Sequence, residues 1–473
     1  MNRLTCNMDK PREACGVFGI HAHPEAGKIT YFGLYALQHR GQESAGIAVA
    51  RNRCITTHNG MGLVSDVFRM DHLEKLNGGS AIGHVRYSTT GSSTLVNTQP
   101  LTVHYMNNDY ALAHNGNLVN AHILKQELEQ DGSIFRSTMD SELALHIFIK
   151  NLKFGFEQAL LNMVARIKGA YSFVLLTGRG EVVGIKDPNG LRPLCLGMLN
   201  GHYVLASESC ALDLLQAEFV RELEPGEIVI IDDTGIRSLF GEPPRRRTFC
   251  IFEYIYFARP DSTIYGRNVY QTRKAHGRQL AREAPVSADL VMPFPDSGNY
   301  AALGYCEESG LPYEIAMIRN HYIGRTFIQP TQNMRDFGVR IKLNPVRELL
   351  KGKEIIIIED SIIRGTTART RIKALRELGV KKIHMRVSCP PHRFPCYYGI
   401  DFSTRGELIA ATKTVRELES FIGLDSLHYL SLEGLLESTT AGSPAEKEQF
   451  CKACFDGQYP VPIEAGVSKG CLE

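Results

Sequence analysis

A strongly apolar run near residue 355 leads into a cluster of side chains that could bind phosphate and metal. Four isoleucines, 355–358, precede Glu359 and Asp360. Because isoleucine is β-branched and the run is too short for a helix, we expect a strand buried on both faces, as in a parallel sheet. The two carboxylates then lie at the carboxyl edge of that sheet, where open α/β folds bind their ligands. The small and hydroxyl residues that follow are Ser361, Gly365, Thr366 and Thr367.

A helix is expected directly after this loop. Ala368, Ile372 and Leu375 recur at helical spacing. The N-terminus of such a helix carries partial positive charge and points back at the loop, while Gly365 lets backbone N–H groups approach an anion closely. An ordinary β-to-α turn with a solvated acidic pair is the alternative, although few such turns combine two acids, a glycine and three hydroxyls.

The strand, the acidic pair and the loop from Arg364 to Thr367 resemble the signature of type I phosphoribosyltransferases, which bind 5-phosphoribosyl 1-diphosphate. The resemblance implies that Glu359 and Asp360 face the ribose and a Mg²⁺-bound substrate, and that the loop starting at Ser361 cradles the 5-phosphate. Members of that family commonly carry two aspartates. Here the first carboxylate is on the longer arm of Glu359.

Length and charge set limits on the rest of the protein. A chain of 473 residues is expected to form two domains rather than one core. Its 53 basic and 51 acidic residues give a formal charge of +2, which offers no electrostatic footprint for nucleic acid or an anionic membrane. No apolar run reaches the length of a membrane span, and residues 1–14 lack the apolar core of a secretory signal. We therefore expect a cytoplasmic protein. In its reducing surroundings the twelve cysteines are not assumed to form disulfides, and metal binding or catalysis must be considered for some of them.

A cysteine near the N-terminus is followed by four glycine- and polar-rich segments. Cys15 begins a strand-like stretch after a charged leader, and a lone cysteine there is by default a buried apolar residue. The four segments lie between strand-like or helical runs, and loops of that composition on a rigid scaffold commonly carry binding chemistry. They are residues 37–46, 83–91, 114–117 and 138–142.

Together these segments resemble the glutaminase domain of class II glutamine amidotransferases, which belong to the N-terminal nucleophile hydrolases. The resemblance runs from Cys15 to about Arg245 and implies a four-layer αββα sandwich of two sheets between helices. It also implies that residues 1–14 are a propeptide, whose removal makes Cys15 the N-terminal residue. The chemistry agrees, because a thiol titrates near ~8.5 and an α-amino group near ~7.7–8.0, so the freed amine can act as base for its own side chain.

The matching family positions supply a site for glutamine. Arg86 can pair with the α-carboxylate through its planar fork, and Asp140 can receive the α-ammonium. Asn115 and the backbone N–H of Gly116 match the oxyanion hole, which stabilises the intermediate formed when the thiol attacks the amide. Arg40 matches a position that packs near the nucleophile and contributes to glutamine binding, with a surface ion pair as the alternative.

Paired prolines and a basic cluster at 241–248 predict a domain boundary. We expect the glutaminase domain at 15–245, a parallel-sheet phosphoribosyltransferase domain at 246–445 and a C-terminal tail at 446–473. The turn with Asp296 and Ser297 matches a diphosphate-binding loop, which places Ser297 beside Glu359 and Asp360 at Mg²⁺. Residues 318–342 match a loop that closes over the substrate and excludes water.

Four cysteines stand apart from the others. Cys451 and Cys454 have the spacing of metal ligands, and Cys250 and Cys396 are single cysteines far away in sequence. Spacing alone predicts zinc or a redox pair. One branch of the enzymes that join these two domains carries a [4Fe–4S] cluster on four cysteines at these places, so the resemblance favours iron–sulfur, with zinc as the alternative.

The two resemblances together imply one two-step enzyme. Ammonia released from glutamine at Cys15 passes internally to phosphoribosyl diphosphate, giving 5-phosphoribosylamine, glutamate and diphosphate at the start of purine synthesis. Family members are homotetramers inhibited by purine nucleotides. Two alternatives remain: an amidotransferase that feeds ammonia to another acceptor such as a sugar phosphate, and a non-catalytic sensor that binds phosphoribosyl diphosphate.

Overall fold

The structure is a computed structural model, and it describes residues 15–87, 92–241, 246–320, 343–400 and 405–463. The expected propeptide at 1–14 and most of the expected closing loop at 318–342 lie outside the described residues. Of the helices in the described part of the chain, none is both long and apolar enough to cross a membrane.

The nucleophile candidate Cys15 immediately precedes the central strand of a seven-stranded antiparallel sheet, which has the order β11-β9-β10-β1-β4-β2-β3. Its strands are β1 (Gly16–Ile20), β2 (Ser44–Arg51), β3 (Cys54–Met61), β4 (Ser80–Arg86), β9 (Cys195–Leu199), β10 (His202–Ala206) and β11 (Glu218–Glu222). One face packs on the helices α1 (Ala26–Ala36), α2 (Val64–Val67), α3 (Met70–Lys75) and α7 (Ser209–Leu215).

A second sheet of six strands has the order β13-β12-β8-β7-β6-β5. Its strands are β5 (Leu101–Tyr105), β6 (Asn108–Leu118), β7 (Gly169–Thr177), β8 (Val182–Lys186), β12 (Glu227–Asp232) and β13 (Gly235–Phe240). The helices on its outer face are α4 (Ala121–Gln130), α5 (Asp140–Asn151) and α6 (Phe156–Arg166).

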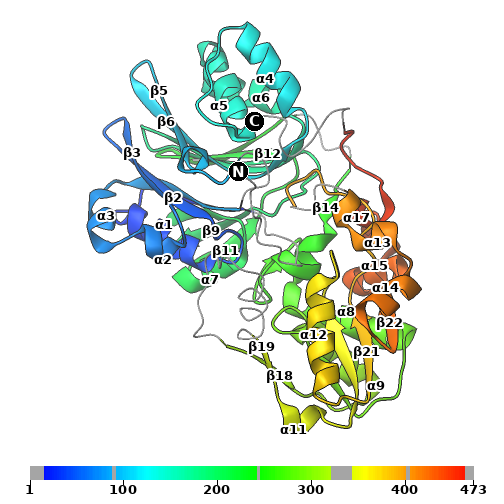
Figure 1. The fold of residues 1–473 in the computed structure, drawn as a ribbon. Coiled ribbons are helices and arrows are strands. Elements are labelled where there is room, and N and C mark those ends of the chain that lie inside the picture. The colour runs from blue at the N-terminus through cyan, green and yellow to red at the C-terminus, as the bar shows by residue number, and fades with distance from the viewer. Residues whose placement is uncertain (1–14, 88–91, 242–245, 321–342, 401–404, 464–473) are drawn as a thin grey trace, which may run out of the picture.

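The inner faces of the two sheets pack against each other. Val17 and Ile82 of the first sheet share one buried apolar cluster with Val174 and Val229 of the second. Helices therefore cover the outer face of each sheet, giving helix, sheet, sheet and helix layers (Figure 1). This arrangement confirms the expected four-layer sandwich.

The C-terminal part is built on a four-stranded parallel sheet of order β17-β20-β21-β22, as expected. The strands are β17 (Leu290–Pro293), β20 (Glu354–Glu359), β21 (Lys382–Val387) and β22 (Ser426–Tyr429), and the larger helices are α8 (Val269–Glu283), α9 (Asn299–Ser309), α12 (Thr366–Glu377), α14 (Val415–Ile422) and α15 (Leu432–Thr440). All four isoleucines of β20 are fully buried. A strand with two covered faces explains why this run is continuously apolar rather than alternating.

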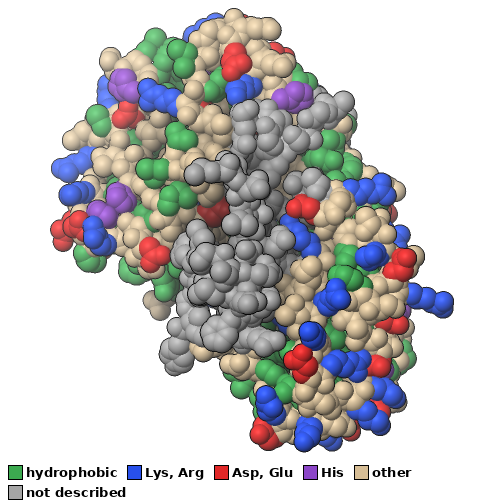
Figure 2. All heavy atoms as spheres, in the orientation of Figure 1, with side chains coloured by type: hydrophobic (Ala, Val, Ile, Leu, Met, Phe, Trp, Pro, Cys, Tyr) green, Lys and Arg blue, Asp and Glu red, His purple; other side chains and the backbone are tan. Residues whose placement is uncertain are grey.

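Short elements connect these layers. They are the strands β14 (Phe249–Cys250), β15 (Thr263–Ile264), β16 (Arg267–Asn268), β18 (Met317–Arg319), β19 (Leu343–Pro345) and β23 (Phe450–Cys451), the helices α11 (Arg347–Leu350), α13 (Ile409–Thr412), α16 (Pro444–Lys447) and α17 (Ala453–Asp456), a π-helix at Glu253–Phe257, and 3₁₀ turns at Leu95–Asn97, Leu152–Phe154 and Arg405–Glu407. Because β14 pairs in parallel with β23, the tail is tied to the segment that opens the second sheet domain. Basic and acidic side chains are interspersed on the face shown in Figure 2, in keeping with the near-neutral net charge.

Candidate active sites

Cys15 is buried at the start of β1, with only 6% of its surface exposed. Its thiol lies 3.4 Å from the carbonyl oxygen of Tyr87, to which it can donate. Burial raises the pKa of the thiol, against the opposing effects of the Tyr87 contact and the Arg86 charge. While Cys15 is joined to Ala14 by a peptide bond, the neutral thiol is therefore the dominant form at neutral pH.

Two charged side chains lie around this thiol, one from the first sheet and one from a helix that packs on the second sheet. Arg86 ends β4 beside β1, and Asp140 begins α5; both are buried. Burial by itself raises the pKa of Asp140, but the contact with His114, 3.4 Å away, and the backbone amides of Leu118 and Ser141 lower it below its usual value. The carboxylate is thus charged, and the pair offers one cation and one anion, as an α-amino acid requires.

Asn115 and Gly116 are supplied by β6 of the second sheet. Asn115 is fully buried, and among the described residues neither atom of its amide group has a hydrogen-bond partner. A buried amide without partners costs free energy that a bound ligand can recover. Gly116 has φ +150°, and a Cβ there would lie 2.0 Å from the carbonyl oxygen of Ala170, so only glycine fits.

Arg40 is fully buried and does not form a surface ion pair. Its Nε donates to the carbonyl oxygen of Cys15 at 3.0 Å. The remaining guanidinium nitrogens bond Glu208 and Glu253, the latter at 2.7 and 3.0 Å. Arg40 therefore contacts the main chain of the nucleophile and holds two carboxylates.

At the second site, Asp360 lies at the carboxyl end of β20, where the loop after β17 meets it. Ser297 donates a hydrogen bond to one carboxylate oxygen, and Ser361 donates to the other at 2.7 Å. A Cβ on Gly298 would lie 2.4 Å from the carbonyl oxygen of Ile358, so the loop packs directly on the strand end. The structure thus brings Ser297, Asp360 and Ser361 together from two strands.

The other two acids at this edge have basic partners. Glu359 lies 3.7 Å from Arg371 of α12 and is buried. Asp296 forms an ion pair with Arg319 at the end of β18. The longer arm of Glu359 therefore reaches a cation on the following helix, whereas Asp360 contacts hydroxyl groups.

The phosphate-loop candidates surround the start of α12. Gly365 caps the helix with φ +74°, and Thr366 and Thr367 form its first turn. Arg364 has its side chain 2.7 Å from Glu407. The N-terminus of a twelve-residue helix behind a glycine cap is a favourable position for phosphate.

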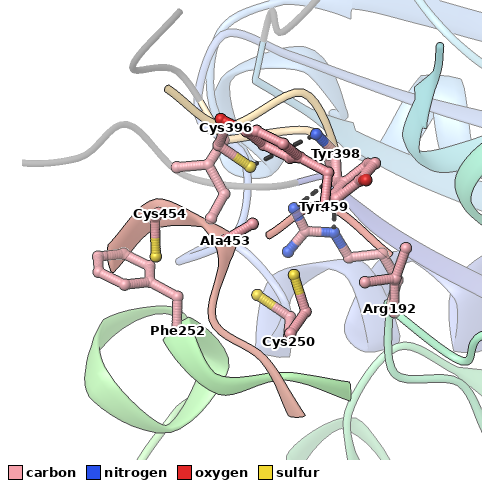
Figure 3. Close-up of a pocket in the computed structure, with 11 residues that line it drawn as sticks. Arg192, Cys250, Phe252, Cys396, Tyr398, Ala453, Cys454 and Tyr459 are labelled. Carbon is pink, nitrogen blue, oxygen red and sulfur yellow. Dashed lines mark hydrogen bonds between the residues drawn. The ribbon is translucent and has the colours of Figure 1, made fainter. Parts of the chain in front are cut away.

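The four cysteines of the expected cluster line one cavity (Figure 3). Cys250 comes from β14, Cys396 from the segment after β21, and Cys451 and Cys454 from the tail, with Arg192 and Tyr398 on the same wall. All ten cysteines that the structure describes are free thiols. In the described part of the chain, no group of three or more histidine, cysteine or acidic residues is arranged to hold a metal ion.

The chemistry of this donor set nevertheless fits a thiolate-bound centre. Burial raises the pKa of all four thiols, that of Cys250 to about 11. A bound metal centre would supply the positive charge that ionises them. Burial opposes the charge of Arg192, but its ion pair with Glu253 helps to raise the pKa of this guanidinium above the usual value.

Sequence reasoning missed the buried ion pairs behind the nucleophile. Glu208, Glu253 and Arg192 have fully buried side chains and come from three distant segments. Glu253 begins the short π-helix Glu253–Phe257, and Arg192 lies between β8 and β9. Their pairing follows from tertiary contacts. His114 begins the polar segment 114–117, and the structure adds its contact with Asp140.

These features define a glutamine amidotransferase fold joined to a parallel-sheet domain with an acidic, phosphate-loop edge. Residues 84–214 match the family model of a glutamine amidotransferase domain. Amidophosphoribosyltransferase of Bacillus subtilis is 48% identical, with 95% of each chain aligned, and that of Synechococcus elongatus is 48% identical over 98% of this chain and 94% of the relative. The chain belongs to the amidophosphoribosyltransferase family.

Solved structures agree with this assignment. The B. subtilis glutamine phosphoribosylpyrophosphate amidotransferase, in complex with ADP and GMP, matches with a TM-score of 0.92 and 47% identity, over 97% of this chain and all of that one. A structure described as the allosteric regulatory enzyme of purine biosynthesis has the same score and identity, over 97% and 99% of the two chains.

Proposed function

We propose that this protein catalyses the first step of purine biosynthesis, in which glutamine, 5-phosphoribosyl 1-diphosphate and water give 5-phosphoribosylamine, glutamate and diphosphate. The observation that carries this proposal is the presence of both half-sites in one chain of this family. A glutaminase site alone would not explain the Asp360 edge of the parallel sheet, and a transferase site alone would not explain the buried thiol near Arg86 and Asp140.

In the glutaminase half, Arg86 binds the α-carboxylate of glutamine and Asp140 binds its α-ammonium. Cys15 attacks the amide carbon, and Asn115 with the backbone N–H of Gly116 stabilises the oxyanion. Ammonia leaves, a thioester forms, and water then releases glutamate. Arg40 positions Cys15 by holding its carbonyl oxygen.

The base for this step is the α-amine of Cys15, which we propose becomes free when residues 1–14 are removed. Because burial raises the pKa of the thiol, a base within the same residue is well placed to remove its proton.

We propose that the glutaminase domain is 15–245, that the transferase domain is 246–445, and that 446–473 form a tail.

In the transferase half, Asp360 and Glu359 hold the ribose, and Ser361, Arg364, Gly365, Thr366 and Thr367 bind the 5-phosphate. Asp296 and Ser297 face the diphosphate. Mg²⁺, held by Ser297, Glu359 and Asp360 together with substrate oxygens, would neutralise charge on the leaving group. Ammonia is nucleophilic without activation, so these residues act by orienting the substrate and excluding water.

The four cysteines at 250, 396, 451 and 454 are proposed to hold a [4Fe–4S] cluster, with zinc as the alternative. Such a centre would join the tail to the transferase domain. Iron, zinc and acid-labile sulfide measured on protein purified without oxygen test this. We expect about four iron and four sulfide per chain, and zinc without sulfide would establish the alternative.

Purine nucleotides are proposed as feedback regulators, and the ADP and GMP bound to the B. subtilis relative support this. We further propose a homotetramer in the cytoplasm, a reducing compartment that suits the free thiols of the described cysteines. Nucleotide inhibition of the purified protein and its mass by light scattering test the first two proposals.

The decisive experiment is a product assay with a Cys15→Ser variant. We expect it to lose glutamine-dependent formation of phosphoribosylamine and to retain formation from free ammonia, because the transferase site does not use the thiol. Amide-¹⁵N glutamine should label the product of the unchanged protein. Equal loss of both reactions in Cys15→Ser would contradict the division between two half-sites.

The same assay separates the two alternatives. A sensor of phosphoribosyl diphosphate would bind it without turnover, and an amidotransferase for another acceptor would release glutamate without consuming phosphoribosyl diphosphate. Intact mass adds a second criterion, since the enzyme is expected to begin at Cys15.

A further inference from the structure

A segment that carries one of the four cysteines lies directly against the oxyanion residues. The side-chain amide of Asn117 donates to the carbonyl oxygen of Tyr397 at 2.8 Å. A Cβ on Gly399 would lie 3.1 Å from the carbonyl carbon of Gly116 and 3.2 Å from its oxygen. The stretch after Cys396 therefore supports the β6 backbone that holds Asn115 and Gly116.

The same segment is linked to the nucleophile through buried charges. Arg192 donates to the carbonyl oxygen of Tyr398 at 2.7 and 3.2 Å and to Glu253 at 3.0 Å. Glu253 also accepts from Arg40, which bonds the main chain of Cys15. Figure 3 shows Arg192 directed at Tyr398, with Cys250 and Cys396 nearby.

The tail holds this segment from the other side. The Tyr398 hydroxyl donates to the carbonyl oxygen of Val461 at 2.6 Å and accepts from its amide at 3.0 Å. The Tyr459 hydroxyl donates to the carbonyl oxygen of Pro395 at 2.7 Å. Residues 395–399 thus have partners in the tail, in the buried ion pairs and in β6.

We propose that Tyr397, Gly399 and Asn117 are positioning residues for the oxyanion side of the glutamine site, so that the four cysteines govern amide hydrolysis and not phosphoribosyl transfer. This inference rests on the proposed function. The physical reason is that oxyanion donors act only when they are fixed in advance, and a displacement of about 1 Å can cost on the order of 100-fold in rate.

A Gly399→Ala variant tests the contact with Gly116. The added methyl must push against backbone atoms, whereas Gly423→Ala carries similar backbone strain, φ +90° against +98°, and meets no atom closer than 3.9 Å. We expect Gly399→Ala to lower glutamine-dependent kcat at least about tenfold, and ammonia-dependent kcat less than twofold. Gly423→Ala should leave both unchanged.

A second readout separates positioning from general damage. We expect Gly399→Ala to slow the labelling of Cys15 by a diazoketone analogue of glutamine at least about tenfold. Labelling by iodoacetamide, which needs no glutamine pocket, should be unchanged. If Gly399→Ala lost both reactions and reacted faster with iodoacetamide, the variant would be unfolded. Asn117→Ala, which only removes a side chain, would then test the positioning role by the same measurements.

The link to the cysteines is tested with Cys396→Ser. This variant should lose glutamine-dependent turnover and diazoketone labelling, and it should keep ammonia-dependent turnover and iodoacetamide labelling. Wild-type rates in Gly399→Ala and Asn117→Ala would overturn the positioning role, and wild-type diazoketone labelling in Cys396→Ser would overturn the link to the cysteines. Absence of glutaminase activity in the unchanged protein would instead overturn the proposed function.

Discussion

Residue chemistry at the nucleophile depends on a conflict between burial and ionisation. The Cys15 thiol is 6% exposed, and burial raises its pKa. Arg86 and the Tyr87 contact oppose that shift without reversing it. The structure therefore positions the thiol but leaves it neutral. We propose that the freed α-amine accepts its proton and so produces the reactive thiolate.

This conflict predicts a pH dependence for the reaction of Cys15 with iodoacetamide. With residues 1–14 attached, the raised pKa keeps the thiol neutral, so the rate should rise only above the ordinary thiol value of about 8.5. In the mature chain, the rate should instead rise near ~7.7–8.0, where the α-amine loses its proton. Rates measured by mass spectrometry from pH 6 to 10 compare the two forms, and identical profiles would contradict a role for the amine.

At the scale of elements, each site gathers side chains from at least two strands. Asp360 and Ser297 follow neighbouring parallel strands, and Asn115 and Arg86 come from facing sheets. The start of α12 requires an unusual backbone conformation. Gly365 caps it with φ +74°, and a Cβ there would lie 3.2 Å from Ile409.

Gly365→Ala is therefore expected to disturb the phosphate loop. Left-handed backbone at a non-glycine residue costs about 1–3 kcal/mol, and the methyl also presses on Ile409. We expect the KM for phosphoribosyl diphosphate to rise at least about fivefold in both the glutamine and ammonia reactions. The matched control is Gly379→Ala, with φ +87° and its nearest atom at 3.7 Å. Equal effects of the two substitutions would attribute the change to strain alone.

On the scale of the whole molecule, the C-terminal tail is tied to the first strand after the predicted domain boundary. Phe249 and Cys250 pair with Phe450 and Cys451, side by side in a parallel bridge. Phe450 is buried against Phe249 and Tyr254, with ring centroids 6.2 and 6.1 Å apart. Apolar packing thus brings the cysteines from both ends of the domain to one cavity.

Phe450→Ala should destabilise this junction by about 3–5 kcal/mol, the usual cost of removing a buried aromatic ring. Denaturant unfolding followed by fluorescence or circular dichroism measures the change. The control is Phe154→Ala, whose side chain is 60% exposed and should change stability by less than about 0.5 kcal/mol. A similarly small effect of Phe450→Ala would show that the tail is not held by this contact.

The sequence by itself determined the two kinds of domain and named candidate residues for each site. The isoleucines of β20 indicated a covered parallel strand because β-branched residues in a short continuous run favour one. The resemblance of four separated motifs to the glutaminase family, in the family's order, implied that Cys15, Arg86, Asn115 and Asp140 share one site. Those residue roles remain predictions, as do the domain boundaries and the cluster.

Only the tertiary structure decided which distant groups share buried surroundings. Arg40, Glu208, Glu253 and Arg192 have separations along the chain of up to 213 residues in their paired contacts, and no local pattern marks them. The contact of Gly399 with Gly116 and the meeting of four cysteines at one cavity are likewise set by packing. The physical reason is that buried charges and close backbone contacts are fixed by the whole fold, since each needs partners that the adjacent sequence does not contain.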